Sequence, residues 1–164
     1  MNAFVKENEI NSVIEFGSGD GNQLSLFEFK KYIGLDVSLT AVEMCKERFK
    51  NDNTKNFFLY DSSQFSDRDP VFKADLALSL DVIYHIIEDK IFDKYMRHLF
   101  SSANKFVIIY SSDRDDNKND APHYKNRNFS TCIDNNLKDW KLIKKIPNKY
   151  PDESSSDFFI FQKL

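Results

Sequence analysis

The feature that most constrains the fold is a cluster of glycines near the start of the chain. Three of its four glycines, Gly17, Gly19 and Gly21, stand at alternate positions directly after the apolar run V-I-E-F. Glycine adopts a positive φ easily and has no Cβ, so it lets the backbone turn tightly and approach a ligand closely. An ordinary turn between a strand and a helix needs one glycine rather than three. The cluster therefore predicts a strand that ends in a ligand-binding turn.

Length and composition describe one globular domain. The chain has 164 residues and a hydrophobic content of 41%, enough for a conventional core. Apolar runs stay well short of the roughly 20 residues that a membrane span needs, and the first ten residues lack the apolar stretch of a signal peptide. Two cysteines are too few for a disulfide framework. We therefore expect a single domain over residues 1–164, in the cytoplasm, with no membrane partner.

Charge and motif content narrow the classes of partner. The net charge is −3, so the chain has no overall basic field and a nucleic acid is not expected as a partner. The sequence contains no C-x-x-C pair, no H-E-x-x-H and no clustered histidines, and we predict no metal site. A small-molecule substrate is the expectation that remains.

Short β-rich runs alternate with amphipathic stretches, which indicates an α/β domain with a parallel sheet. Cys45 is expected in the core and His98 on the surface. The expected strands are residues 12–16, 31–35, 56–60, 74–79, 105–111, 140–146 and 158–162. The expected helices are residues 23–29, a helix capped by Ser38 that runs to residue 50, and residues 88–100 and 129–136.

Polar residues stand where several of these strands end. Asp36 closes the second strand, 19 residues after Gly17, and Asp61 follows the third. Ligands of parallel sheets bind at the carboxyl ends of the strands, where an acidic residue at the end of the second strand accepts hydrogen bonds from ribose hydroxyls. The sequence therefore predicts a nucleotide-type ligand at this edge.

The segment E-F-G-S-G-D-G-N resembles the first motif, E/D-x-G-x-G-x-G, of the class I S-adenosylmethionine-dependent methyltransferases, and the resemblance extends over nearly the whole chain. It implies a Rossmann-like, doubly wound, mostly parallel sheet of seven strands in the order 3-2-1-4-5-7-6, with strand 7 antiparallel. It also implies S-adenosylmethionine as the cofactor and S-adenosylhomocysteine as its product. The glycine spacing differs from the G-x-G-x-x-G pattern of dinucleotide-binding folds.

The same resemblance implies roles for the residues at the strand ends. The three glycines would pass under the methionine and ribose, and Asp36 would hold the ribose hydroxyls. The remaining cofactor contacts would come from Glu15 to the methionine ammonium, from Asp61 with Ser62 to the adenine amino group, and from the backbone at Leu80 or Asp81 to the ammonium.

Residues on the acceptor side are expected after the fourth and fifth strands. His85 follows the fourth strand and is a candidate general base, since an imidazole titrates near neutrality, and Tyr84 could line the same pocket. Later in the chain, P-H-Y-K-N-R-N brings together His123, a second candidate base, Lys125 and Arg127. This cluster could anchor an anionic group, with Arg127 as the best anchor. It could equally be a solvated surface loop.

Several alternatives stay open at this stage. We expect methylation at oxygen of a small acceptor, either anionic or of the saccharide type, and the C-terminal part loosely resembles methyltransferases of bacterial surface-polysaccharide modification. About ten residues precede the first strand, so a lid could come from residues 113–128, from a second copy or partner subunit, or from a longer natural protein. A catalytically silent S-adenosylmethionine-binding subunit and an NAD-dependent oxidoreductase are the rival functions.

Overall fold

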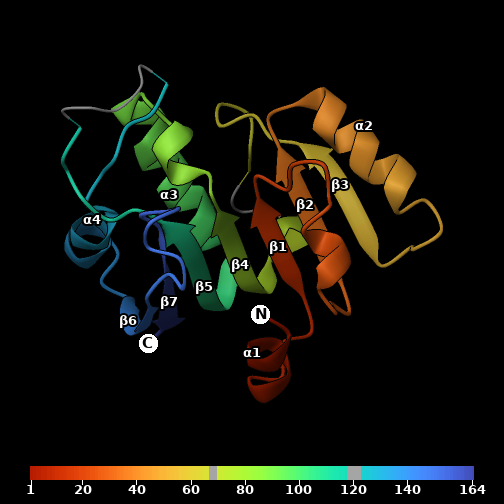
Figure 1. The fold of residues 1–164 in the computed structure, drawn as a ribbon. Coiled ribbons are helices and arrows are strands. Elements are labelled where there is room, and N and C mark those ends of the chain that lie inside the picture. The colour runs from red at the N-terminus through yellow and green to blue at the C-terminus, as the bar shows by residue number, and fades with distance from the viewer. Residues whose placement is uncertain (67–69, 118–122) are drawn as a thin grey trace.

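The computed structural model describes residues 1–66, 70–117 and 123–164. In these residues, seven strands form one sheet in the order β3-β2-β1-β4-β5-β7-β6, which Figure 1 shows across the middle of the molecule. The first five strands pair in parallel, whereas β7 runs antiparallel to both β5 and β6. The strand order and the reversal of β7 confirm the predicted topology.

All seven predicted strands form, together with three of the predicted helices, and α1 is a further helix that the sequence analysis does not predict. The helices are α1 (Asn2–Glu7), α2 (Leu39–Arg48), α3 (Asp89–Ser101) and α4 (Phe129–Asn136). The strands are β1 (Val13–Phe16), β2 (Tyr32–Asp36), β3 (Lys55–Leu59), β4 (Ala74–Leu80), β5 (Ala103–Ser111), β6 (Trp140–Ile146) and β7 (Asp157–Lys163). Each strand begins and ends within two residues of its predicted bounds.

Two hydrophobic layers cover the two faces of the sheet. Successive side chains of a strand point to opposite faces, and in β1 this places Ile14 and Phe16 in a cluster with residues of α3 and α4. Val13 belongs instead to the second cluster, together with Val42 and Cys45 of α2. Cys45 is fully buried, as predicted. None of the helices in the described ranges is long and apolar enough to cross a membrane.

The prediction of a helix over residues 23–29 is wrong. Only a single 3-10 turn, Leu24–Leu26, forms there, and Phe27 is already extended. The reason is tertiary packing: Phe29 is buried in the second cluster with Val5 of α1 and Phe57 of β3, and its ring stacks on Tyr32 with centroids 5.9 Å apart. An extended chain carries Phe29 to this position, and this burial outweighs the local helical preference.

The expectation that His98 lies on the surface is also wrong. His98 is 8% exposed, and its Nδ1 lies 2.9 Å from the hydroxyl of Tyr60. Its ring also contacts Phe65, with centroids 4.9 Å apart. Tyr60 and Phe65 follow β3, far from α3 in sequence, so the pattern of α3 alone could not show that this face is covered.

Candidate cofactor and acceptor site

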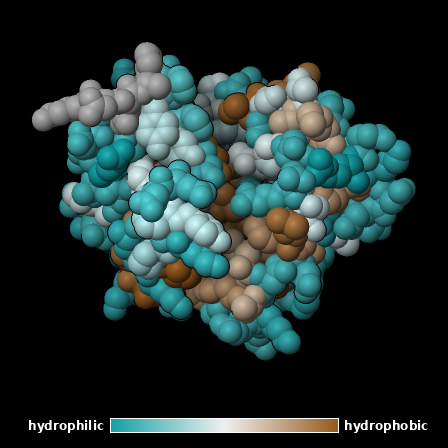
Figure 2. Space-filling view, viewed as in Figure 1, coloured by the Kyte–Doolittle hydropathy of each residue, from teal (hydrophilic) through white to brown (hydrophobic). Residues whose placement is uncertain are grey.

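A cavity of about 700 Å³ opens at the carboxyl ends of the central strands. Its wall includes Gly17 after β1, Asp36 at the end of β2, Tyr60 after β3 and Leu80 at the end of β4. This is where the chain order reverses on either side of β1, the position at which open α/β sheets bind ligands. Figure 2 shows a furrow with hydrophobic residues along it, between the part of the surface that carries α3 and the part that carries α2.

The three clustered glycines all have positive φ, but they serve different purposes. A Cβ on Gly17 would lie 2.3 Å from a methyl group of Val82, and one on Gly21 would lie 2.9 Å from the sulfur of Cys45. These two positions need glycine because neighbouring protein atoms approach closely. Gly19 has φ +56°, and a Cβ there would meet no atom of the described residues within 4 Å. Gly19 also lines the cavity, so its missing side chain leaves room for a ligand.

Asp36 joins the glycine turn to the start of α2. Its Oδ2 accepts a hydrogen bond from the amide of Gly19 at 2.9 Å, and its Oδ1 accepts one from the amide of Ser38 at 2.8 Å. Ser38 in turn caps α2, since its side chain accepts from the amide of Ala41, as the sequence predicted. A carboxylate has about four acceptor positions. Asp36 is therefore held in place with capacity left for the hydroxyls of a ligand in the cavity.

Glu15 lies beneath the glycine turn rather than in the cavity wall. Its side chain is 3% exposed, and its Oε2 accepts a hydrogen bond of 2.5 Å from the hydroxyl of Tyr32. Burial raises the pKa of Glu15 to about 7, against the lowering effect of the Tyr32 hydrogen bond. Burial and the nearby Glu15 also raise the pKa of Tyr32 well above its usual value. The pair braces β1 against β2 below the turn.

Asp81 follows β4 in an unusual backbone conformation, with φ +59°. Its amide donates to the carbonyl of Tyr110 at 3.0 Å, and its Oδ1 accepts from the hydroxyl of Tyr84 at 2.7 Å. Tyr84 also stacks on Tyr124, with ring centroids 4.5 Å apart. Burial and the hydrogen bond to Asp81 raise the pKa of Tyr84 far above its usual value. Tyr84 therefore keeps its proton and supports Asp81, which lines the cavity.

A further part of the cavity wall is formed by the residues between β4 and α3. His85, Ile86, Ile87 and Glu88 line it there, together with Ile91 of α3. The side chains of Ile87 and Ile91 are 45% and 38% exposed, so their apolar surface is open to a bound molecule. His85 is exposed as well. The imidazole thus belongs to the same part of the wall as these apolar side chains.

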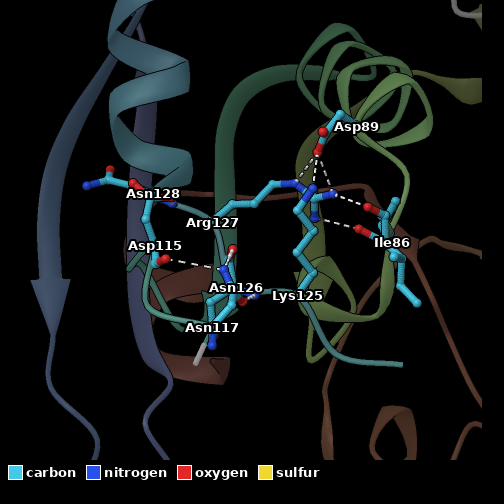
Figure 3. Close-up of polar contacts among 9 residues, drawn as sticks. Ile86, Asp89, Asp115, Asn117, Lys125, Asn126, Arg127 and Asn128 are labelled. Carbon is cyan, nitrogen blue, oxygen red and sulfur yellow. Dashed lines mark hydrogen bonds and ion pairs between the residues drawn. The ribbon is translucent and has the colours of Figure 1, made fainter. Parts of the chain in front are cut away.

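The cluster around Arg127 does not stand free in the cavity. It belongs to a segment that we call the strap, residues 113–117 and 123–128; the intervening residues 118–122 of the predicted lid lie outside the described residues. The guanidinium of Arg127 donates to Asp89 and to the carbonyls of Ile86 and Ile87, as Figure 3 shows. Lys125 Nζ lies 2.6 Å from the same Asp89 carboxylate. Both cations therefore already have an anionic partner, and their hydrogen bonds hold the pKa of Asp89 below its usual value.

The other predicted site residues lie outside the cavity wall described here. Asp61 accepts hydrogen bonds from the amide of Ser63 at 2.7 Å and from the side-chain amide of Gln64 at 3.0 Å, and these bonds, chiefly those from Ser63, lower its pKa. His123 is exposed on the strap. Among the described residues, the predicted positions that do not line the cavity are Glu15, Gly21, Asp61, Ser62, Tyr84, His123 and Arg127.

Sequence reasoning missed two tyrosines in the wall. Tyr60 directly follows β3, so its place at a strand end could have marked it. Tyr95 belongs to the buried face of α3, where that face meets the cavity. Its hydroxyl lies 2.7 Å from Ser79 Oγ and donates to the carbonyl of Phe16 at 3.2 Å, which fixes the end of β1. In the described part of the chain, no group of three or more metal-ligating side chains comes together.

These residues fit S-adenosylmethionine. The open space at Gly19 permits the close backbone approach that the cofactor requires, and Asp36 is available for ribose hydroxyls. The wall also carries Asp20, Asp81 and Glu88 but, among the described residues, no lysine or arginine. An acidic wall favours a ligand with a positively charged sulfonium and ammonium group. When bound, the cofactor supplies an electrophilic methyl group.

Comparisons with known proteins agree with this site. The profile of a family described as a methyltransferase domain matches residues 2–145. No curated protein matches the chain. Among solved structures, the methyltransferase domain of bacterial CtHen1-C superimposes with a TM-score of 0.76 at 21% identity and covers 98% of this chain and 93% of its own.

Two further structures have the same fold. The N-methyltransferase NodS from Bradyrhizobium japonicum WM9, in complex with S-adenosylhomocysteine, has a TM-score of 0.76 at 16% identity, covering 97% of this chain and 81% of its own. Magnesium protoporphyrin IX methyltransferase from Synechocystis PCC 6803, with bound S-adenosylmethionine, has a TM-score of 0.69 at 15% identity. The match covers 99% of this chain and 76% of that one. With the glycine turn, the strand order and the family match in agreement, the chain belongs to the class I S-adenosylmethionine-dependent methyltransferases.

Proposed function

We propose that this methyltransferase acts on a hydroxyl oxygen of a small, uncharged acceptor of the saccharide type, with His85 as the general base. The observation that carries the proposal is the place of His85, an exposed imidazole, in the wall of the same cavity as Gly19 and Asp36. An acceptor beside His85 would lie beyond a cofactor held at Gly19 and Asp36. The imidazole would take the hydroxyl proton as the oxygen becomes nucleophilic, an effect of typically 10²- to 10⁴-fold on rate.

The charges of the wall favour an uncharged acceptor over the anionic alternative. Four carboxylates line the cavity, from Asp20, Asp36, Asp81 and Glu88. An anionic acceptor would meet like charge there, which opposes binding. Arg127 is the expected anchor for an anion, but its guanidinium already donates hydrogen bonds to Asp89 and to two backbone carbonyls. The saccharide class itself rests on the resemblance of the C-terminal part to polysaccharide-modifying methyltransferases.

A primary amine is the second candidate acceptor. The same four carboxylates would attract a protonated amine, so the acidic wall supports nitrogen methylation as well as oxygen methylation. The two candidates differ in what His85 must do. A hydroxyl acceptor needs a base to remove its proton as it reacts. An ammonium that the wall attracts must instead lose its proton before the free amine attacks, and it can lose it to solvent without His85.

Methyl transfer to a matched set of acceptors tests the proposal. Radiolabelled S-adenosylmethionine is supplied with a methyl glucoside, the corresponding glucuronide and the corresponding glucosaminide. All three have ring hydroxyls, and the second and third carry in addition a carboxylate or an amine. We expect transfer to the glucoside. The variant His85→Gln should lower kcat about 10²- to 10⁴-fold, with the affinity for S-adenosylhomocysteine unchanged.

The matched control is His123→Gln, which changes the second histidine of the acceptor side and should leave kcat as in the wild type. Transfer to the glucosaminide alone, with full activity in His85→Gln, would favour the amine candidate. A loss of activity in His123→Gln and not in His85→Gln would assign the base to the strap and contradict the proposed role of His85.

A further inference from the structure

We propose that Arg127 is a positioning residue that fixes the acceptor wall of the cavity, rather than a residue that binds the acceptor. The inference rests on the proposed place of the acceptor beside His85. It concerns the stretch between β4 and α3, in which Ile86 and Ile87 line the cavity with their side chains. Their carbonyl groups are held by the strap, from a part of the chain about 40 residues away in sequence.

The guanidinium of Arg127 makes four hydrogen bonds to this stretch and to the first residue of α3. Nη1 donates to the carbonyl of Ile86 at 2.5 Å, and Nη2 donates to the carbonyl of Ile87 at 2.7 Å. Nε and Nη2 also donate to Asp89 Oδ1, at 3.2 and 2.9 Å. The face of the guanidinium lies over the ring of Phe92, 4.6 Å from its centroid. One side chain thus joins two loop carbonyls to the first turn of α3.

These contacts require the shape of arginine. Its planar fork presents several donors in fixed directions, so it can bond two carbonyls and a carboxylate at once. A lysine ammonium is a point charge on a flexible stem and cannot reproduce this arrangement. The Arg127 side chain is 11% exposed, whereas that of Asp89 is 71% exposed. The arginine is therefore enclosed by the groups that it holds, and its donors point toward the backbone of the acceptor wall (Figure 3).

The strap can act as a support because hydrogen bonds join it to the elements beside it and join its two parts to each other. Ser112 Oγ, directly after β5, donates to Asn126 Oδ1, and the amide of Ser130 in α4 donates to Asp113 Oδ1 at 3.0 Å. Asn126 is 1% exposed, and its amide donates to Asn117 Oδ1 at 2.6 Å while its Nδ2 donates to the carbonyl of Asp116 at 3.2 Å. The amide of Asn128 donates to Asp115 Oδ1 at 2.9 Å. Arg127 stands between these two fastened residues. Its position is set by the strap, and through its carbonyl contacts it sets the position of the acceptor wall.

The test compares Arg127→Lys and Asp89→Asn with Lys125→Met as the matched control. Lys125 pairs with the same carboxylate, whereas the carbonyls of Ile86 and Ile87 accept from Arg127. Hydrogen exchange of the amides of residues 82–92, urea unfolding, S-adenosylhomocysteine affinity, and kcat and KM for the acceptor are measured for each. The exchange measurement needs no acceptor, so it tests the hydrogen bonds from Arg127 to the two carbonyls even if the acceptor class proposed above is wrong.

We expect Arg127→Lys to speed exchange at residues 86–88 and to lower kcat/KM for the acceptor by about 10- to 100-fold, since displacement of a positioning group by about 1 Å can cost about 10²-fold. The affinity for S-adenosylhomocysteine should stay unchanged. Asp89→Asn should lower kcat/KM in the same direction. Lys125→Met should change it by no more than about fivefold, because a solvent-exposed ion pair contributes little.

Three results would overturn the inference. In the first, Arg127→Lys keeps wild-type exchange and kcat/KM. In the second, a carboxylated acceptor binds more tightly to Asp89→Asn and more weakly to Arg127→Lys than to the wild type. That result would show that Arg127, once released from Asp89, binds the acceptor directly. In the third, Arg127→Lys lowers the stability in urea and the cofactor affinity together, which would make the residue a general support of the fold.

Discussion

The substitution Gly19→Ala separates a glycine kept for a ligand from glycines kept for packing. Gly19, with φ +56°, and Gly21, with φ +73°, stand in the same turn. A methyl group on Gly21 would lie 2.9 Å from Cys45 Sγ and 2.8 Å from an atom of Phe49. A methyl group on Gly19 would meet no described atom within 4 Å, at the wall of the cavity. The two variants therefore share backbone strain and differ in what the new methyl group meets.

The structure gives the expected size of each effect. A left-handed backbone costs an L residue roughly 1–2 kcal/mol, so Gly19→Ala should lower the free energy of unfolding by about that amount. Gly21→Ala adds the cost of overpacking, typically 1–3 kcal/mol, for a total of about 2–5 kcal/mol. At Gly19 the new methyl group would meet the bound cofactor rather than the protein, so the same cost of about 1–3 kcal/mol would be lost from the binding free energy. Since 1.4 kcal/mol is a factor of ten, the affinity should fall about 5- to 150-fold.

Urea unfolding without ligand and calorimetric titration with S-adenosylhomocysteine measure the two quantities. Gly19→Ala should be the more stable variant and the weaker binder, whereas Gly21→Ala should be less stable and, where folded, bind nearly as the wild type does. Wild-type affinity in a folded Gly19→Ala protein would refute the assignment of this open position to the cofactor. A loss of stability in Gly19→Ala equal to that in Gly21→Ala would show that the methyl group meets the protein itself.

Two further predictions concern the base of the turn. Glu15 has a pKa of about 7 in the native state against an ordinary value of 4.5, so the native state holds a proton that the unfolded chain releases, and stability should fall as the pH rises through this window. Glu15→Gln should flatten this slope and raise the free energy of unfolding at pH 8 by about 3 kcal/mol at most. Urea unfolding from pH 4 to 8 measures the slope, and an unchanged slope would contradict the raised pKa. Gly17→Ala places a Cβ 2.3 Å from a methyl group of Val82. The double variant with Val82→Ala should therefore lose less free energy of unfolding than the two single variants lose together. Strict additivity in this double-mutant cycle would contradict the contact.

Much of the site could be predicted because its signals are local. Positive φ is a property of single residues, so the spacing of Gly17, Gly19 and Gly21 indicated the turn without any knowledge of the rest of the fold. The alternation of apolar residues gave the strands, and Ser38 gave the start of α2. The position of Asp36 at a strand end then followed from chain order, because the carboxyl ends of parallel strands share one edge of the sheet.

What the sequence by itself determined is therefore the order of elements, the glycine turn and the residues at the strand ends, since each depends on the conformation of neighbouring residues. Only the tertiary structure decided that His98 is buried against Tyr60, that residues 24–26 form a single turn, and that Arg127 holds the carbonyls of Ile86 and Ile87. Each of these depends on a partner far away in the chain. The free energy of such a contact comes from burial and hydrogen bonding between distant segments, and a local pattern carries no record of which segments will meet.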